Sequence, residues 1–222
     1  MYIPDDYAEN RLDVLHSLIT EYPFGVLFTH GSNGLDANHL PFELQASEGE
    51  FGLLRVHVSR VNPVWQDIKN GDEVLVVFQA GDAYISPNWY PSKHEQHRQV
   101  PTWNYRVVHA YGKVTIRDDE RYVRGVVARL TRTHEASQTE PWKMSDAPQT
   151  EPWKMSDAPK DYLEPMLKAI VGIEIEITKL QGKSKLGQNK ERRDILGAAD
   201  GLSKSGHQTI ANAMYSVTEL NK

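Results

Sequence analysis

The chain contains no cysteine among its 222 residues. This absence excludes disulfide bonds, thiolate zinc sites, iron–sulfur ligation and a cysteine nucleophile. It is typical of proteins in a reducing compartment, and we expect the cytoplasm. The N-terminus lacks a basic segment followed by an apolar run, and no stretch approaches the roughly 20 apolar residues of a membrane helix. We therefore expect a soluble, unexported protein with no membrane partner.

An excess of basic charge is also missing. Lys and Arg total 25 against 30 Asp and Glu, a formal net charge of −5. This balance disfavours a generally basic nucleic-acid coat, although one face can still carry a basic patch. With 39% hydrophobic and 25% charged residues, the composition is that of a globular protein with enough apolar side chains for a core.

Several common catalytic and nucleotide-binding motifs are absent. Because neither GxGxxG nor GxxxxGK[ST] occurs, a Rossmann dinucleotide site and a P-loop have no support. No GxSxG elbow or HExxH motif is present either, although His94 and His97 lie close together. We expect no metal site, and the sequence alone assigns no catalytic residue.

Hydrophobic periodicity predicts helices and strands along the chain. Asp5 or Asp6 is expected to cap the first helix, and Asn62 the second. The predicted helices cover residues 6–21, 61–69, a stretch beginning at the cap Asp118, 160–170, 190–199 and 205–217. The predicted strands cover 24–44 (a hairpin turning at 31–34), 52–60, 73–87, 107–116 and 171–180. The polar and aromatic segment 89–105 is predicted to be a long binding loop.

This pattern favours a mainly β fold, a small closed antiparallel barrel with peripheral helices, over a doubly wound parallel sheet. One domain is predicted for residues 1–222, with a helical insertion at about 118–170 and C-terminal helices at about 189–217.

The segment QTEPWKMSDAP occurs twice in tandem, at residues 138–148 and 149–159. Stacked repeat architectures need longer units and at least about three copies. We interpret the repeat as a local duplication in a surface loop, where added length has a small entropic cost.

Alternation in the strand 52–60 places Arg55, His57 and Ser59 on one face. Arg60 and Asn62 follow, at the start of the next predicted helix. Positive charge, hydroxyl groups and free backbone N–H groups together could bind a phosphate. The alternative is a solvated strand face without a ligand.

A second basic cluster lies in GKSKLGQNKERR, at residues 182–193. It could contact phosphate or nucleic acid, or it could be a solvated loop and helix start. The last two predicted helices do not match a helix-turn-helix, because their connection, residues 197–206, is too long and the last helix has no basic face.

Several phrases together resemble the PaiB family of FMN-binding negative transcriptional regulators. They are MYIP, THGSNGLDANHLPFEL, HVSRVNPVW, VFQAGDAYISPNWYPSK, VPTWNYRVVHAYG, HEASQTEPWKMSDAP and MLKAIVGIEIEI. The resemblance runs from Met1 to about Asn189. It implies a split β-barrel of the pyridoxamine-phosphate-oxidase-like type, a homodimer, and FMN bound at the subunit interface.

The resemblance also implies which residues bind FMN. The phrase HVSRVNP matches the phosphate side, and THGSNGLDANHLP the strands beside the flavin ring. The FMN-binding residues implied in this way are Arg55, His57, Ser59, Arg60, His30, Asn38, His39, Lys93, Trp103, Lys185 and Gln188. The chain departs from the family at Val56, where a small residue is usual, and at Ser184 and Gly187, because KWKxSQN is replaced by KSKLGQN.

Three functions are compatible with these observations. The resemblance implies an FMN-binding negative transcriptional regulator, whether or not it contacts DNA directly. The alternative is an FMN-dependent oxidoreductase that passes electrons from a reduced nicotinamide to a small molecule. The third is a ligand-binding protein that has lost flavin.

Overall fold

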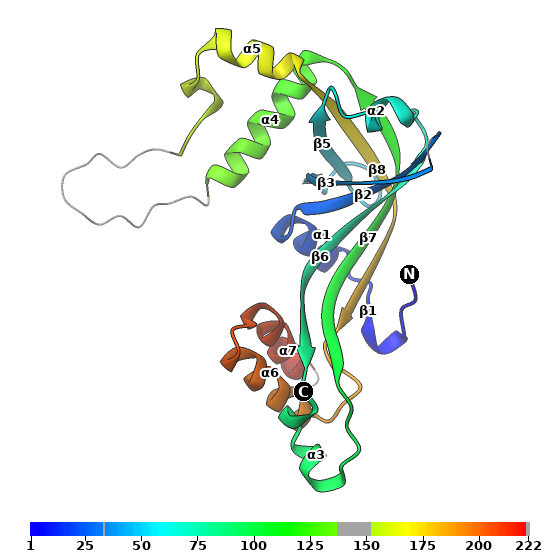
Figure 1. Cartoon of the computed structure of the whole chain (residues 1–222), viewed down its shortest axis with the longest axis vertical. Coiled ribbons are helices and arrows are strands. Elements are labelled where there is room, and N and C mark those ends of the chain that lie inside the picture. The colour runs from blue at the N-terminus through cyan, green and yellow to red at the C-terminus, as the bar shows by residue number, and fades with distance from the viewer. Residues whose placement is uncertain (33, 137–151, 221–222) are drawn as a thin grey trace, which may run out of the picture. The chain divides into compact units, whose positions relative to one another are not determined.

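The computed structural model describes residues 1–32, 34–136 and 152–220, and Figure 1 shows its elements. The helices are α1 (Leu12–Glu21), α2 (Val64–Asp67), α3 (Pro91–Gln96), α4 (Glu120–Glu135), α5 (Lys160–Lys168), α6 (Arg192–Lys204) and α7 (Gln208–Leu220). The strands are β1 (Ala8–Glu9), β2 (Phe24–Gly31), β3 (Gly34–Pro41), β4 (Glu43–Gln45), β5 (Leu53–Ser59), β6 (Glu73–Ile85), β7 (Thr102–Arg117) and β8 (Ile170–Lys185). Short 3-10 helices cover Asp5–Tyr7, Pro87–Trp89 and Met155–Asp157.

The strands form one eight-stranded sheet in the order β3-β2-β6-β7-β8-β5-β4, with β1 paired to β8. The pairs β1/β8, β4/β5 and β5/β8 are antiparallel. The predicted hairpin is present as β2 and β3, although position 33 of its turn lies outside the described residues. The predicted antiparallel, mainly β architecture with peripheral helices is confirmed.

The chain divides into two compact units. The terminal unit comprises Met1–Gly25, Val76–Ala110 and Lys179–Lys222, and the central unit comprises Val26–Leu75 and Tyr111–Thr178. Each unit is described separately below. The interpretation of residues 1–222 as one domain stays a prediction.

In the central unit, β5 and β8 bury alternate apolar side chains. Residues 54, 56 and 58 of β5 are at most 2% exposed, and so are Ile173, Ile175 and Ile177 of β8. On α4 the helical stripe of Val123, Val126 and Leu130 is buried. The alternation predicted for both strands is therefore confirmed, and it leaves the polar residues of β5 on the opposite face.

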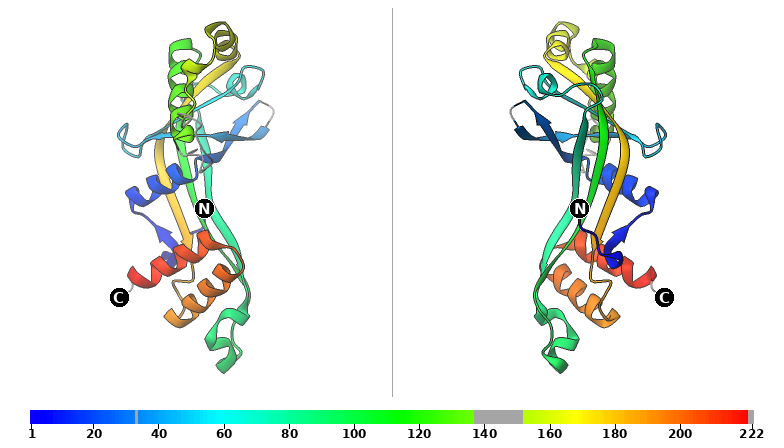
Figure 2. Two further views of the ribbon diagram at one scale, coloured as in Figure 1. Left: turned by 90° about the vertical axis from the view of Figure 1, so that its left-hand side faces the viewer. Right: turned by 90° about the vertical axis from the view of Figure 1, so that its right-hand side faces the viewer.

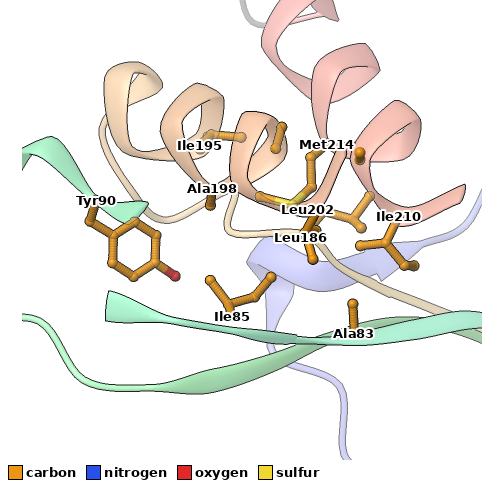
Figure 3. Close-up of a cluster of buried hydrophobic side chains, with 11 residues drawn as sticks. Ala83, Ile85, Tyr90, Leu186, Ile195, Ala198, Leu202, Ile210 and Met214 are labelled. Carbon is orange, nitrogen blue, oxygen red and sulfur yellow. The ribbon is translucent and has the colours of Figure 1, made fainter. Parts of the chain in front are cut away.

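In the terminal unit, an apolar cluster joins α6 and α7 to the end of β6. Figure 3 shows the side chains of both helices pointing toward Ala83 and Ile85 of the strand. Both strand residues are fully buried. Gly201 of α6 allows close packing, because a Cβ there would lie 2.4 Å from the ring of Trp89.

The connection between α6 and α7 is much shorter than predicted. Since α6 continues to Lys204, only Ser205, Gly206 and His207 remain between the helices. Gly206 makes this turn possible with a φ of +85°, which side chains disfavour. The two helices lie against each other in both views of Figure 2. The predicted long connection is wrong. The helix Gln208–Leu220 contains no Lys or Arg, in agreement with the prediction that the last helix has no basic face.

The predicted helix over 6–21 is also wrong in its first half. Residues 5–7 form a 3-10 turn, and α1 begins only at Leu12, without a side-chain cap. The reason is long-range pairing, because Ala8 and Glu9 lie opposite Lys183 and Gly182 of β8. Asp5 and Asp6 therefore do not cap a long helix.

The segment 89–105 is more regular than the predicted loop. Pro91 opens α3, consistent with the preference of proline for the first helical turn. β7 begins at Thr102, so Trp103 and Tyr105 belong to a strand.

The helix that follows β7 is α4, whose cap is Asp119 rather than Asp118. The Oδ1 atom of Asp119 accepts the backbone N–H of Tyr122 at 2.8 Å. Asp118 is instead bonded to an arginine side chain, as described below.

The first QTEPWKMSDAP copy, residues 138–148, lies outside the described residues. Of the second copy, residues 152–159 are described and include the 3-10 turn Met155–Asp157. Among the described helices, none is long and apolar enough to cross a membrane. The described residues also contain no cluster of three or more His, Asp or Glu that could hold a metal ion.

Candidate functional site

The predicted phosphate-binding residues of β5 lie in the central unit, on one face of the strand. Arg55, His57 and Ser59 alternate with fully buried apolar residues. Antiparallel pairing sets Arg55 opposite Glu174 and His57 opposite Gly172 of β8. The alternation in the sequence thus predicts this face correctly, but it does not reveal what β8 contributes.

Arg55 is bonded to two carboxylates. Its Nη2 donates to both oxygens of Glu48 at 2.7 and 2.9 Å, and its Nε donates to Glu174 at 3.4 Å. Glu174 is only 7% exposed and also accepts from Nε of Arg117 at 2.5 Å. The formal charges of these two arginines and two glutamates cancel, so a phosphate approaching Arg55 would also meet two negative groups.

Arg60 is likewise bonded within the protein. Its guanidinium donates to both oxygens of Asp118 at 2.9 and 2.5 Å, and to the carbonyls of Lys168 at 2.7 Å and Ile170 at 3.3 Å. It also lies over the ring of Trp65. The hydrogen bond from Arg60 lowers the pKa of Asp118, which keeps the carboxylate charged and the pair intact. An FMN phosphate would have to compete with Asp118 for this guanidinium.

His57 differs from the two arginines, because its Nδ1 is buried and has no hydrogen-bond partner among the described residues. Burial lowers the pKa of His57 below 6.5, so the ring is neutral at pH 7. The hydroxyl of Tyr122 is buried as well, and burial and the nearby Glu174 raise its pKa. These groups are neighbours, since a Cβ on Gly172, opposite His57, would lie 2.6 Å from the Tyr122 ring. Buried polar atoms without partners are rare in native proteins.

The residues carried over from the β2–β3 hairpin are more exposed. Asn38 accepts from Asn62 at 2.7 Å and donates to Asp36 at 2.7 Å, while Asn62 also accepts the N–H of Val64. The helix predicted over 61–69 is only Val64–Asp67, and its N-cap is Pro63 rather than the predicted Asn62, which precedes the cap and bonds the first helical N–H. The exposed predicted residues of the central unit are Ser59, His30 and His39.

Four predicted residues belong to the terminal unit, and two of them meet. The Nζ of Lys185 donates to the hydroxyl of Thr102 and, at 2.8 Å, to the carbonyl of Trp103. Burial lowers the pKa of Lys185. The Trp103 ring is 55% exposed and stands edge-on to Tyr84, with centroids 6.0 Å apart.

Lys93 and Gln188 make local bonds. Lys93 donates to the side chain of Asn88 at 2.8 Å. Gln188 closes its own turn, because its amide donates to the carbonyl of Ser184 and accepts the N–H of Leu186. Gln188 thus stabilises a backbone turn, whereas Lys93 contacts a neighbouring side chain.

Sequence reasoning missed the carboxylates that pair with the predicted cations. Asp118 is 58 residues from Arg60 and Glu174 is 119 residues from Arg55. The alternating pattern of Ile173 to Thr178 was a usable signal for Glu174, since it placed that residue on a polar face. No local pattern predicts Asp118 as a partner of Arg60, because their contact depends on the tertiary fold.

The residues of the β5 face fit an FMN molecule through His57 and Ser59. The unpartnered Nδ1 of His57 can donate or accept one hydrogen bond, depending on its tautomer. Ser59 is exposed and adds a hydroxyl. Arg55 and Arg60 are less available to bind the FMN phosphate, because each is already paired with a carboxylate.

The antiparallel sheet with its peripheral helices defines the fold class, a split β-barrel. Solved structures share the fold at low identity. The flavocytochrome Anf3 of Azotobacter vinelandii matches with a TM-score of 0.55 and 12% identity, over 82% of this chain and 70% of that one. An FAD and heme binding protein of Mycobacterium smegmatis matches with a TM-score of 0.55 and 15% identity, over 90% and 80%.

This chain belongs to the family described as "Putative FMN-binding domain", which matches residues 1–179. It is 30% identical to protease synthase and sporulation protein PAI 2 of Bacillus subtilis, over 91% of this chain and 89% of that protein. It is 32% identical to an uncharacterized protein of Emericella nidulans, over 93% and 92%. The resemblance to the PaiB family is thereby confirmed.

Proposed function

We propose that this protein binds FMN at the β5 face of the central unit and acts as a flavin-binding negative regulator of transcription. The observation that carries the proposal is the buried Nδ1 of His57, which has no partner among the described residues. Family membership supports the choice of FMN. The name of the related Bacillus protein, which refers to protease synthesis and sporulation, supports a regulatory role.

In this proposal His57 and Ser59 hydrogen-bond the ligand, and Arg60 contributes charge to its phosphate after exchanging Asp118 for it. FMN, when bound, supplies reversible electron transfer. The protein residues bind and orient it. The homodimer implied by the resemblance belongs to the same proposal and is checked by light scattering at the concentrations used for titration.

We do not propose α7 as the element that reads DNA. It lacks Lys and Arg, whereas DNA-binding helices neutralise backbone phosphates with such residues. Regulation therefore fits better with control through the bound flavin or through a partner protein.

The proposal is tested by titrating the purified protein with FMN and following flavin fluorescence and visible absorption. We expect saturable binding of one FMN per chain. His57→Ala should weaken it about tenfold, the effect of one lost hydrogen bond in a buried site. His207→Ala, which removes an exposed imidazole in the terminal unit, is the matched control and should leave the affinity unchanged.

Two results would contradict the proposal. Absence of binding at millimolar FMN would show that FMN is not the ligand. Equal FMN affinity of the two variants would show that His57 does not belong to the site. FMN-dependent oxidation of a reduced nicotinamide, with unchanged transcription in a deletion strain, would favour the oxidoreductase instead.

A further inference from the structure

The terminal unit contains a pocket of about 560 Å³. One of its lining residues, Gln188, is among those that the resemblance implies bind FMN. The wall of the pocket combines side chains from the N-terminal segment, α1, β7, the end of β8 and α7. The residues on which the argument depends are Val14, Arg106, Ser184, Leu186, Ser216 and Val217. Ligand pockets for small molecules typically fall between roughly 300 and 1,000 Å³. Several of these residues lie beyond position 179, where the family match ends.

Arg106 is the chemically distinctive residue of this wall. It lies on β7, is half-buried, and makes no hydrogen bond or ion pair with any residue that the structure describes. Arg11, the other guanidinium of the wall, is engaged by Glu9 through Nε at 2.9 Å and Nη2 at 2.6 Å. A half-buried guanidinium beside an open pocket is well placed to bind an anion.

The rest of the wall limits the kind of anion. Val14, Leu186 and Val217 give it an apolar surface. Asp6, which is exposed, adds a negative charge. A ligand with one negative charge and an apolar body matches this wall better than a phosphate dianion does, because a second charge would be repelled.

Ser184 keeps part of the pocket open. Its side chain is small and lies in the pocket wall. An indole on this wall would occupy space that is available here.

We propose that this pocket binds a small amphipathic monocarboxylate, with Arg106 pairing with the carboxylate and the apolar body lying against Val14, Leu186 and Val217. Every residue of its wall belongs to the terminal unit, whereas the FMN site is proposed on β5 of the central unit.

The test uses 2-naphthoate as the probe and its neutral amide, 2-naphthamide, as the matched ligand, with calorimetry on the full chain. We expect 2-naphthoate to bind at one per chain and at least about tenfold more tightly than the amide. Arg106→Gln should abolish this difference. Arg192→Gln, which removes an exposed arginine of α6 outside the pocket, should retain it.

Ser184→Trp tests the pocket itself and should abolish binding of both ligands while the thermal unfolding midpoint is retained. Equal affinity for the two ligands in the unmodified protein, or unchanged naphthoate binding in Arg106→Gln, would overturn the proposal. No binding at millimolar naphthoate would overturn it too. Displacement of naphthoate by FMN would assign the pocket to the flavin site, whereas failure of FMN binding alone would leave this proposal intact.

Discussion

The most deeply buried carboxylates of the two units have different partners. In the central unit, Glu174 is 7% exposed and is paired with Arg55 and Arg117. In the terminal unit, the most deeply buried carboxylate among the described residues is Asp194, which is 1% exposed and is bonded mainly by neutral groups. In the central unit, charged groups pair on a partly solvated surface. In the terminal unit, the buried carboxylate of Asp194 connects two helices in the interior.

Asp194 is the centre of a hydrogen-bond network in the terminal unit. Asp194 accepts the backbone N–H of Ser92 at 3.0 Å and its hydroxyl at 2.6 Å, and it accepts from Gln99 at 3.2 Å. Lys190 donates to Gln99 at 2.8 Å and lies over the ring of Tyr90. Burial and the nearby carboxylate raise the pKa of Tyr90 to about 12, so its phenol stays neutral. The network joins α3 to α6.

The largest expected effect is the loss of this network. Asp194→Ala leaves buried donors of Ser92 and Gln99 unsatisfied and should lower the free energy of unfolding by about 3 kcal/mol. The central-unit counterpart, Glu43→Ala, removes a partly exposed pair with Arg129 and should lower it by about 1 kcal/mol or less. Urea unfolding of both variants measures the difference, and equal losses would break the comparison.

A second comparison uses one buried histidine from each unit. Burial lowers the pKa of both His57 and His109 below 6.5. Because the folded pKa is depressed, the unfolded state binds protons first as pH falls through 6.5, and stability declines until the folded pKa is passed. His57→Gln and His109→Gln should each make stability less dependent on pH between about 7 and 5. Unchanged pH dependence in either variant would show that its histidine does not contribute.

The third expected effect concerns the competition between Asp118 and a phosphate. If Arg60 contacts FMN, Asp118→Asn should tighten FMN binding about threefold by releasing the guanidinium. The control Glu120→Gln removes the partner of Arg124 on α4 and should have no effect. Unchanged FMN affinity in Asp118→Asn would leave Arg60 with a structural role only.

The smallest effect is expected for the tandem repeat. Deleting residues 138–148 or 149–159 yields the same chain, because the two copies are identical. Shortening the segment by 11 residues should change the free energy of unfolding by at most about 0.5 kcal/mol, since loop closure depends weakly on length. A loss above about 1.5 kcal/mol in urea unfolding would show that the second copy makes essential contacts.

The sequence was most informative where local periodicity determines structure. The alternation along β5 and β8 identified their buried faces, and the stripe of α4 identified its core side. The helix predicted from residue 6 failed because Ala8 and Glu9 pair with a strand more than 170 positions away. The end of α6 was missed because Gly201, normally unfavourable in a helix, packs against Trp89.

The residues of the candidate site could be predicted from the sequence, but the residues that bond to them could not. The β5 phrase identified His57 and both arginines, yet the partners of the arginines come from distant segments. Arg106 carried no local signal, because an unpaired arginine in a strand looks like any other exposed cation in the sequence. Its significance depends on the tertiary structure, in which it makes no hydrogen bond or ion pair with any described residue and lies in a pocket wall.

The pairing of β5 with β8 has a consequence for how the chain folds. Contacts such as Arg55 with Glu174 close a loop of 119 residues, and this loop includes the whole tandem repeat. The α6–α7 hairpin, joined by three residues, forms its contacts almost locally. Since long-range pairing slows folding, the hairpin should become protected from hydrogen exchange early and β5 late. A nascent chain cannot pair β5 with β8 until β8 has been synthesised, so β5 has only the short strand β4 as a partner through more than a hundred residues of translation.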